Sequence, residues 1–167
     1  MVTQGGSGVT LYPAWLPELL QVDPWTGHTF EILYEIFTRD FKISRPHFQG
    51  YEVWFFPEMD EGKEKIFWHL THQDDEEAGV RLPDPRRSER LPWVRCLIEN
   101  PERQEVIWWD YREASGDIHT YIWLKEYDFV VVMKKYRDGK RRLISAFHIS
   151  YSHTRRSLEK KYNRRIK

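Results

Sequence analysis

The sequence predicts an α+β fold: an antiparallel β-sheet meander with helices packed on one face and a basic C-terminal helix. Two observations support this prediction. In the second half of the 167-residue chain, four segments rich in β-branched and aromatic residues follow one another with only short turns between them, which is typical of an antiparallel meander. Elsewhere, apolar residues recur three and four positions apart, which is the spacing of amphipathic helices.

The first part of the chain predicts a turn-rich lead and a helix. Residues 11–24 hold three prolines among apolar side chains, which indicates a short helix or a turn. Residues 29–41 carry apolar side chains three and four positions apart, so we expect a long helix there, with Thr26 or Thr29 as its N-cap.

The middle of the chain predicts a hairpin and a second helix. Residues 51–56 and 65–72 are aromatic and β-branched and flank an acidic turn, so we expect them to pair as two strands. Residues 73–87 are expected to form a loop. A helix should then run from about residue 88 to residue 100, with Pro92 in its first turn.

Four strands and a basic helix complete the predicted fold. The dipeptide Asp138-Gly139 is a signal for a type I′ turn between the last two strands. The strands are expected at residues 105–111, 118–125, 129–136 and 141–151, and the helix at residues 154–164.

The composition is that of a folded domain with many large rings. Hydrophobic residues make up 40% and aromatic residues 16% of the chain, which suffices for a core at this length. The rings either fill that core or partly form stacking platforms for bases or a partner. Cys96 is the single cysteine, so an intrachain disulfide is impossible and a reducing, cytoplasmic location is expected. The sequence lacks a signal-peptide pattern and any run of 18 apolar residues, so we expect no membrane partner.

Charge is strongly segregated along the chain, although the net charge is zero. Residues 134–167 hold 13 lysines and arginines against 2 acidic residues, a net charge of +11, and the other 133 residues carry −11. We interpret the basic end as the site of an anionic partner such as RNA. Two other interpretations stay open: the acidic part covers the basic part within the fold, or the basic helix is a solvated face.

Motifs of the common phosphate and metal sites are missing from the sequence. It has no glycine-rich phosphate loop and no HExxH, CxxC or GxSxG motif, so we expect no cofactor and no metal site. His69 and His72 would point to opposite faces of a strand and could not ligate one metal. The remaining His, Arg, Lys, Tyr and Ser residues are the types used in metal-independent RNA cleavage. In that reaction a base takes the 2′-OH proton and cations stabilise the phosphorane.

Four residues are the catalytic candidates. His69 lies in the apolar segment 65–72 and is either a satisfied core histidine or the proton acceptor. Arg90 and Arg95 lie near the start of the second predicted helix, where an arginine fork can bind two phosphate oxygens. Ser145 lies on the last predicted strand.

Strand alternation restricts what the last strand can offer to one site. It places Ser145 on the face opposite Arg142 and His148, so a regular strand cannot present Ser145 and His148 together. Six further basic residues are expected to contact a nucleic-acid backbone, namely Arg87, Lys125, Arg142, Arg155, Arg156 and Lys160.

Five segments of the second part of the chain resemble a known nuclease group. They are Phe67–Thr71, Arg87–Arg95, Trp123–Val132, Leu143–Phe147 and Arg155–Tyr162. Their order and spacing are similar to phage and mobile-element members of the barnase/EndoU/colicin/RelE-like (BECR) nuclease group. The resemblance covers about residues 65–162 and implies a metal-independent ribonuclease, often a toxin, with an inhibitor or antitoxin as a partner. By position it implies His69, Arg90, Arg95 and Ser145 as site residues. The chain departs from the group at Gln73, where a basic residue is expected.

The resemblance also divides the chain. It implies an N-terminal extension at residues 1–64, with a short helix, a long helix and one strand, packed on a nuclease domain at residues 65–167 as one unit. The expected function is a metal-independent endoribonuclease that cleaves RNA by transesterification, with a toxin-like role as one option. Two alternatives stay open: a non-catalytic nucleic-acid-binding protein of a phage or mobile element, and an interaction module in which the acidic body and basic end of two subunits pair.

Overall fold

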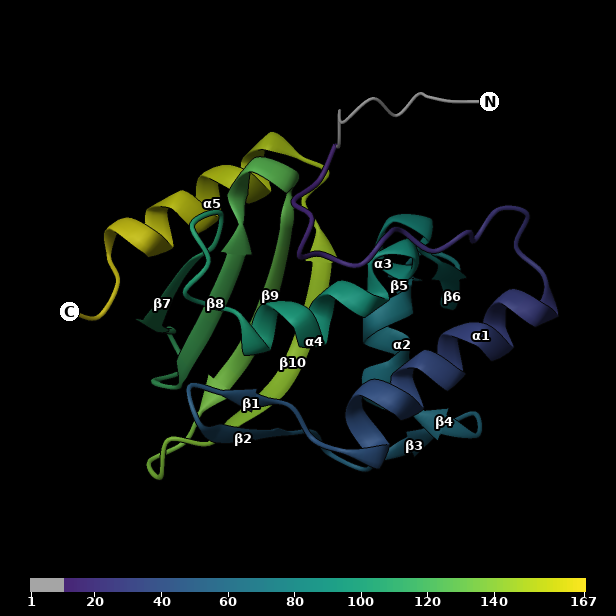
Figure 1. Cartoon of the computed structure of the whole chain (residues 1–167), viewed down its shortest axis with the longest axis horizontal. Coiled ribbons are helices and arrows are strands. Elements are labelled where there is room, and N and C mark those ends of the chain that lie inside the picture. Colours follow the sequence, from purple (N-terminus) through teal and green to yellow (C-terminus); the bar gives the residue numbers. More distant parts are fainter. Residues whose placement is uncertain (1–10) are drawn as a thin grey trace.

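A six-stranded sheet lies at the centre of the computed structural model, which describes residues 11–167 (Figure 1). Its order is β1-β2-β10-β9-β8-β7, and every neighbouring pair is antiparallel except β2 with β10. The strands are β1 (His47–Phe48), β2 (Tyr51–Trp54), β7 (Ile107–Arg112), β8 (Ile118–Leu124), β9 (Phe129–Lys135) and β10 (Arg141–His148). The predicted α+β class and the meander from β7 to β10 are confirmed.

The predicted hairpin of residues 51–56 with residues 65–72 is wrong, because the second segment is a helix. β2 pairs with β1 and, in parallel, with the first two residues of β10. Residues Lys65–Thr71 form α2, in which Lys65 and His69 are exposed and the other five residues are buried. A run this short and apolar does not reveal its period, so packing against α1 and the edge of β10 determines its structure.

The long helix of the first part is confirmed. It is α1 (Gly27–Phe37), which continues as a π-helical segment, Thr38–Ile43. Thr26 is its N-cap: the Thr26 side chain accepts from the Thr29 N–H, and the Thr29 side chain accepts from the Thr26 N–H. Residues 11–25 form turns and extended chain rather than the short helix.

The predicted helix from residue 88 to residue 100 is two helices. α3 (Pro85–Glu89) and α4 (Leu91–Glu99) meet at Arg90, whose φ of −103° and ψ of 7° break the helical path. Pro92 lies in the first turn of α4, as predicted, where its missing N–H breaks no helical hydrogen bond.

Two small hairpins lie outside the main sheet. The predicted loop at residues 73–87 contains one of them, formed by β5 (His72–Asp75) and β6 (Val80–Pro83). The other, formed by β3 (Met59–Asp60) and β4 (Lys63–Glu64), precedes α2. Four consecutive acidic residues, 74–77, hide the strand pattern of the first hairpin, because a run of charges shows no alternation.

The turn between β9 and β10 is not the predicted type I′ turn. Gly139 has a φ of 91°, but Asp138 does not have the positive φ that a type I′ turn needs. Instead, the Gly139 N–H donates to the Tyr136 carbonyl (3.0 Å), and the Tyr136 N–H donates to the Lys140 carbonyl (2.9 Å). This pattern is that of a type I turn followed by a glycine bulge.

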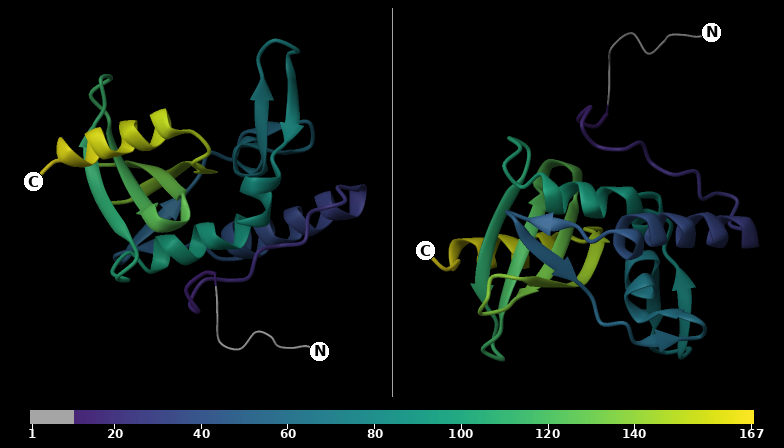
Figure 2. Two further views of the ribbon diagram at one scale, coloured as in Figure 1. Left: turned by 90° about the horizontal axis from the view of Figure 1, so that it is seen from above. Right: turned by 60° about the horizontal axis from the view of Figure 1, so that its bottom comes forward.

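Helices cover both faces of the sheet (Figure 2). α4 packs on the face that carries Ile122 and Val131, and α1 and α2 extend the same core. α5 (Ser152–Asn163) covers the opposite face, where its Leu158 joins a second cluster around Trp109. The expectation of helices on one face therefore fails for the basic C-terminal helix.

The larger core joins the two parts of the chain that the resemblance separates. Leu33 and Phe37 lie on one side of the boundary at residue 64, Leu97 and Ile122 lie on the other, and all four are buried in one cluster. Within residues 11–167, no helix is both long enough and apolar enough to cross a membrane.

Candidate functional site

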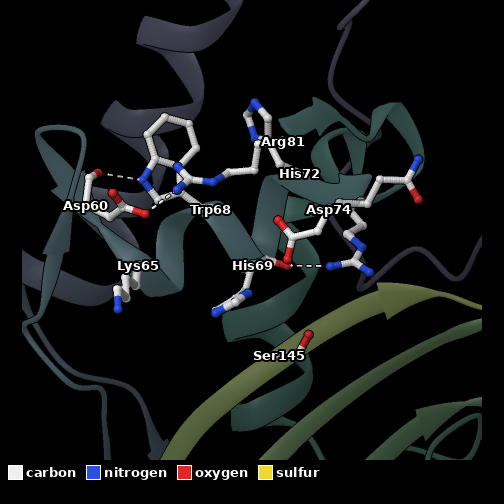
Figure 3. Close-up of a pocket in the computed structure, with 10 residues that line it drawn as sticks. Asp60, Lys65, Trp68, His69, His72, Asp74, Arg81 and Ser145 are labelled. Carbon is white, nitrogen blue, oxygen red and sulfur yellow. Dashed lines mark hydrogen bonds and ion pairs between the residues drawn. The ribbon is translucent and has the colours of Figure 1, made fainter. Parts of the chain in front are cut away.

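An open cavity of about 460 Å³ lies beside β10 (Figure 3). β2 pairs with only the first two residues of β10, and α2 and α3 pack against that strand. The cavity lies between α2, the β5–β6 hairpin, α3 and β10. The side chains that determine its chemistry are Lys65, His69, Asp74, Arg81, Arg87 and Ser145.

Helix α2 presents Lys65 and His69 to the cavity from one face, because residues four apart on a helix lie one above the other. His69 is exposed, and Figure 3 shows its ring directed into the space above Ser145. The placement of His69 on a strand is therefore corrected. Of the two interpretations left open, a satisfied core histidine and a catalytic one, the exposure of His69 excludes the first.

Ser145 lines the same cavity beside a β-bulge in β10. The register of β10 against β9 shifts between Leu143 and Ser145. Arg142 and Ser145, which regular alternation places on opposite faces, consequently share one face. His148 lies on the other face and contacts Ser150 (3.0 Å), so Ser145 and His148 do not serve one site, as predicted.

Arg87 connects α3 to the end of α2 at the cavity wall. Its Nη1 donates to the backbone carbonyl of His69 (2.7 Å), and its Nε lies 3.1 Å from a carboxylate oxygen of Asp84. Burial lowers the pKa of the Arg87 guanidinium from its usual value, and the carboxylates of Asp84 and Asp74 oppose that shift. The Arg87 guanidinium is thus held against the backbone of α2 at His69.

Arg81 brings a second guanidinium from β6. It lies over the ring of Trp68, 4.5 Å from the ring centroid, and forms an ion pair with Asp60. The Trp68 Nε1–H donates to the backbone carbonyl of Asp60 (2.9 Å), so the three residues hold the β5–β6 hairpin, α2 and β3 together. Arg81 stands directly opposite Asp74 in the hairpin.

The electrostatic surroundings favour a neutral His69. Partial burial lowers the pKa of its ring below 6.5, and the nearby cations Arg87, Arg81 and Lys65 lower it further. Asp74 acts in the opposite direction. A histidine that is neutral at pH 7 can accept a proton, which is the property that a general base needs.

His72 is a structural histidine, although it also borders the cavity. Its ring packs against the rings of Trp68, Trp25 and Phe30 at centroid distances of 5.1, 5.6 and 5.8 Å. The Thr71 hydroxyl donates to the Phe67 carbonyl (2.8 Å), so Nδ1 of His72 donates to Thr71 Oγ1 (2.8 Å). Burial, with a contribution from Arg81, lowers the pKa of His72 to about 4.

We expect His72 to make the fold sensitive to mild acid. The folded chain keeps the ring neutral down to about pH 4, whereas the unfolded chain binds a proton below pH 6.5, so stability falls as the pH drops between these values. The free energy of unfolding should be about 2 kcal/mol lower at pH 5 than at pH 7.5 from this group alone. Urea denaturation at both pH values measures the difference, and His72→Gln should reduce it. Equal pH dependence in the two proteins would contradict the assignment.

Arg90 does not line the cavity. It is only 4% exposed, and its Nη1 donates to the Arg86 carbonyl (3.0 Å) and to a carboxylate oxygen of Glu89 (2.5 Å). Its guanidinium lies 5.2 Å from the centroid of the Trp93 ring. These contacts hold the junction of α3 and α4 together.

Arg95 also lies outside the cavity. Its Nη1 donates to the carbonyl of Asp40 (2.8 Å) and to the hydroxyl of Ser44 (2.9 Å), and its Nε donates to Glu99 (3.2 Å). The side chain thus ties α4 to the π-helical segment. Of the four catalytic candidates, the structure brings His69 and Ser145 together and leaves both arginines elsewhere.

The residues expected to bind a nucleic-acid backbone occupy three places. Arg87 lines the cavity, and Arg142 lies next to it on β10. Lys125 and Arg155 meet over the ring of Trp123, where Arg155 also pairs with Asp128 (2.9 Å). The remaining two are on α5: Arg156 and Lys160 are exposed, and neither forms an ion pair with any residue in the 11–167 range.

The acidic part of the chain neutralises part of the basic end. Six of the 13 basic residues from position 134 onward form ion pairs, namely Lys134, Lys135, Lys140, Arg141, Arg155 and Lys161. Among them, Arg141 is buried and contacts Asp110 (3.7 Å) and Thr120 (3.2 Å). The interpretation that the acidic part covers the basic part therefore holds for these six residues.

Lys65 and Arg81 line the cavity, although neither is among the site residues predicted from the sequence. Lys65 stands four residues before His69, a spacing that has meaning only on a helix. Arg81 lines the cavity from β6. It reaches the cavity because the β5–β6 hairpin folds it back opposite Asp74. The glycine at position 79, with a φ of 66°, was the available signal for a turn there.

Fold and site together define an α+β protein with an open, polar cavity around one accessible histidine, in which Lys65, Arg81 and Arg87 pair with Glu58, Asp60 and Asp84. No protein-family model, no curated protein and no solved structure matches the chain. Among residues 11–167, histidine, cysteine and acidic side chains do not gather in groups of three or more suited to a metal ion.

Proposed function

We propose that the chain is an endoribonuclease and that the cavity around His69 is its active site. The observation that carries this proposal is that His69, Arg87 and Ser145 reach one cavity from α2, α3 and β10. A proton acceptor beside several cations is the arrangement that 2′-OH transesterification of RNA requires. The resemblance of residues 65–162 to BECR nucleases points in the same direction.

In the proposed reaction, His69 takes the proton of the 2′-OH as the 2′ oxygen bonds to phosphorus. The bond from phosphorus to the 5′ oxygen breaks, and the Lys65 ammonium donates a proton to that oxygen. Lys65, Arg81 and Arg87 stabilise the negative charge of the phosphorane, and the Ser145 hydroxyl donates to one of its oxygens. Asp74 repels phosphate, and Glu58, Asp60 and Asp84 pair with the three cations, so a bound phosphate must compete with these carboxylates. The products are a 2′,3′-cyclic phosphate and a 5′-OH.

Cleavage of a DNA oligonucleotide that contains one ribonucleotide tests the proposal. In the presence of EDTA, the wild-type chain should cut only after the ribonucleotide and leave a cyclic phosphate, which mass spectrometry identifies. The same oligonucleotide without the 2′-OH is the matched control and should stay intact. Cutting of that control, or no cutting of any RNA substrate, would contradict the proposal.

The exposed face of α5 supports nucleic-acid binding independently of the reaction. Arg156, Lys160 and Arg164 are spaced four residues apart and are all exposed, so they form one basic stripe. None of them has an ion-pair partner among the residues that the structure describes. Binding without turnover through this stripe is the second candidate function.

We expect the stripe to contribute to the salt dependence of RNA binding. Each phosphate that a cation neutralises adds about 0.7 to the slope of log K against log salt for a single strand. The double variant Arg156→Gln/Lys160→Gln should therefore lower the slope by about 1.4. Fluorescence anisotropy from 50 to 200 mM salt measures it, with Arg103→Gln, an exposed cation on the α4–β7 connection, as control. An unchanged slope in the double variant would remove α5 from the binding surface.

A further inference from the structure

A second, smaller cavity adjoins the first one at His69. Its volume is about 180 Å³, and Lys65 and His69 line both cavities. The other walls of the smaller cavity are four apolar side chains, Phe56, Ile66, Leu143 and Ile144, and two charged ones, Glu58 and Arg142. The two cavities are therefore neighbours, and the candidate general base, His69, lies between them.

Phe56 is the unusual wall of this second cavity. It lies between β2 and β3, and 50% of its surface is exposed. Burial of apolar surface normally stabilises the folded state by about 25 cal/mol for each Å², so an exposed phenylalanine forgoes part of this stabilisation. The Arg142 guanidinium lies 4.0 Å from the centroid of its ring, and Trp54 packs against it edge-to-face at 5.4 Å. Neighbouring side chains thus hold the ring in place while half of it stays open.

A hydrogen bond keeps Arg142 in position. Its Nε donates to the Tyr136 hydroxyl (3.1 Å), and the Tyr136 ring lies 5.4 Å from that of Trp54. Arg142, Phe56, Trp54 and Tyr136 therefore form a fixed set of flat groups beside the second cavity. Aromatic rings and arginine guanidinium planes are the groups on which proteins stack unpaired bases.

We infer that the second cavity receives one unpaired nucleobase, stacked on Phe56, while the adjacent phosphate lies among the cations of the first cavity. This inference rests on the proposed function, since it places a nucleotide next to His69. The inference predicts a substrate that is single-stranded at the cleaved position. A base in a duplex would first have to be unpaired and unstacked, which costs free energy. Every base has a flat face that can stack on Phe56, so the stacking contact selects strandedness more than sequence.

Binding of uncleavable oligonucleotides tests the inference separately from the reaction. The probes are a 2′-O-methyl RNA hexamer and a hexamer of abasic residues with the same number of phosphates. Phe56→Ala should weaken binding of the first probe about tenfold, which corresponds to about 1.4 kcal/mol and lies in the range of base–aromatic stacking. It should leave binding of the abasic probe unchanged. Phe56→Trp, which keeps a flat ring, should retain the wild-type affinity for both.

Ile43→Ala is the control for the loss of exposed apolar surface, since Ile43 is 77% exposed and lies outside both cavities. Equal effects of Phe56→Ala on the two probes, or no effect on either, would overturn the inference even if the wild-type chain cleaves RNA. A selective loss on the hexamer would support it even if no RNA is cleaved. A mass by light scattering that rises with concentration and returns to that of the monomer in Phe56→Ala would assign the ring to self-association and overturn it as well.

Discussion

Replacing His69 by alanine should slow RNA cleavage by a factor of about 10² to 10⁴, which is the usual contribution of a general base. The effect should appear in kcat rather than in binding, because Lys65, Arg81 and Arg87 still hold the phosphate. Single-turnover cleavage of a fluorescent RNA in EDTA measures it. A parallel anisotropy titration with a 2′-O-methyl strand should give the wild-type Kd.

His28→Ala is the matched control for this variant. His28 is an exposed histidine at the start of α1, and its imidazole lies 4.0 Å from Glu31, outside both cavities. It should cleave at the wild-type rate. If His69→Ala kept more than about a tenth of the wild-type rate, His69 would not be the base.

The pH profile gives a second readout of the same residue. A base acts in its unprotonated form, and burial and the surrounding cations lower the pKa of His69 below 6.5. The acidic limb of kcat/KM should therefore lie below pH 6.5, and replacement of Arg87 by methionine should move it to higher pH. An acidic limb of kcat/KM above pH 6.5 in the wild-type chain would contradict the assignment of His69, whose pKa is lowered, as the general base.

The largest loss of stability is expected for Trp93→Ala, at about 3–5 kcal/mol. Trp93 is fully buried on α4 and contacts the rings of Tyr12 (5.1 Å) and Phe129 (5.7 Å). Its Nε1–H donates to the Pro17 carbonyl (2.7 Å). The side chain thus connects the N-terminal segment to the sheet, and its removal would leave both a hole and an unpaired carbonyl. Urea denaturation monitored by circular dichroism measures the loss.

One variant separates the contributions of the Trp93 ring and its hydrogen bond, and a second variant, elsewhere in the chain, is the control. Trp93→Phe keeps most of the ring and removes only the donor, so it should cost about 1–3 kcal/mol. Ile43→Ala, at an exposed position, should stay within about 0.5 kcal/mol of the wild type. A loss below about 1 kcal/mol for Trp93→Ala would mean that residues 12–17 are not packed on α4 in solution.

Long periodic segments could be predicted from the sequence, and short apolar ones could not. The helix at 27–37 and the strands from 107 to 148 have enough residues to show a period of 3.6 or 2, and their turns carry glycine and aspartate signals. In Lys65–Thr71 the same reasoning failed, because seven residues of mixed β-branched and aromatic type satisfy either period.

The candidate site was predicted in part for a related reason. His69 and Ser145 followed from residue type and from the resemblance, but strand alternation put Ser145 on the wrong side of Arg142, since a bulge cannot be read from alternation. Arg90 and Arg95 were chosen for their charge near a helix start. In the structure both guanidiniums bind groups of the protein itself: Arg90 donates to Glu89, and Arg95 donates to the carbonyl of Asp40.

The sequence by itself determined the α+β class, the four-stranded meander and the uneven distribution of charge, because these depend on the order and spacing of residues along the chain. The tertiary structure alone decided that residues 65–71 are helical, that Arg81 folds back to the cavity and that Ser145 lines the same cavity as His69. Those three outcomes depend on contacts between α2, the β5–β6 hairpin and the edge of β10. Such contacts join residues far apart in sequence, and local patterns carry no information about them.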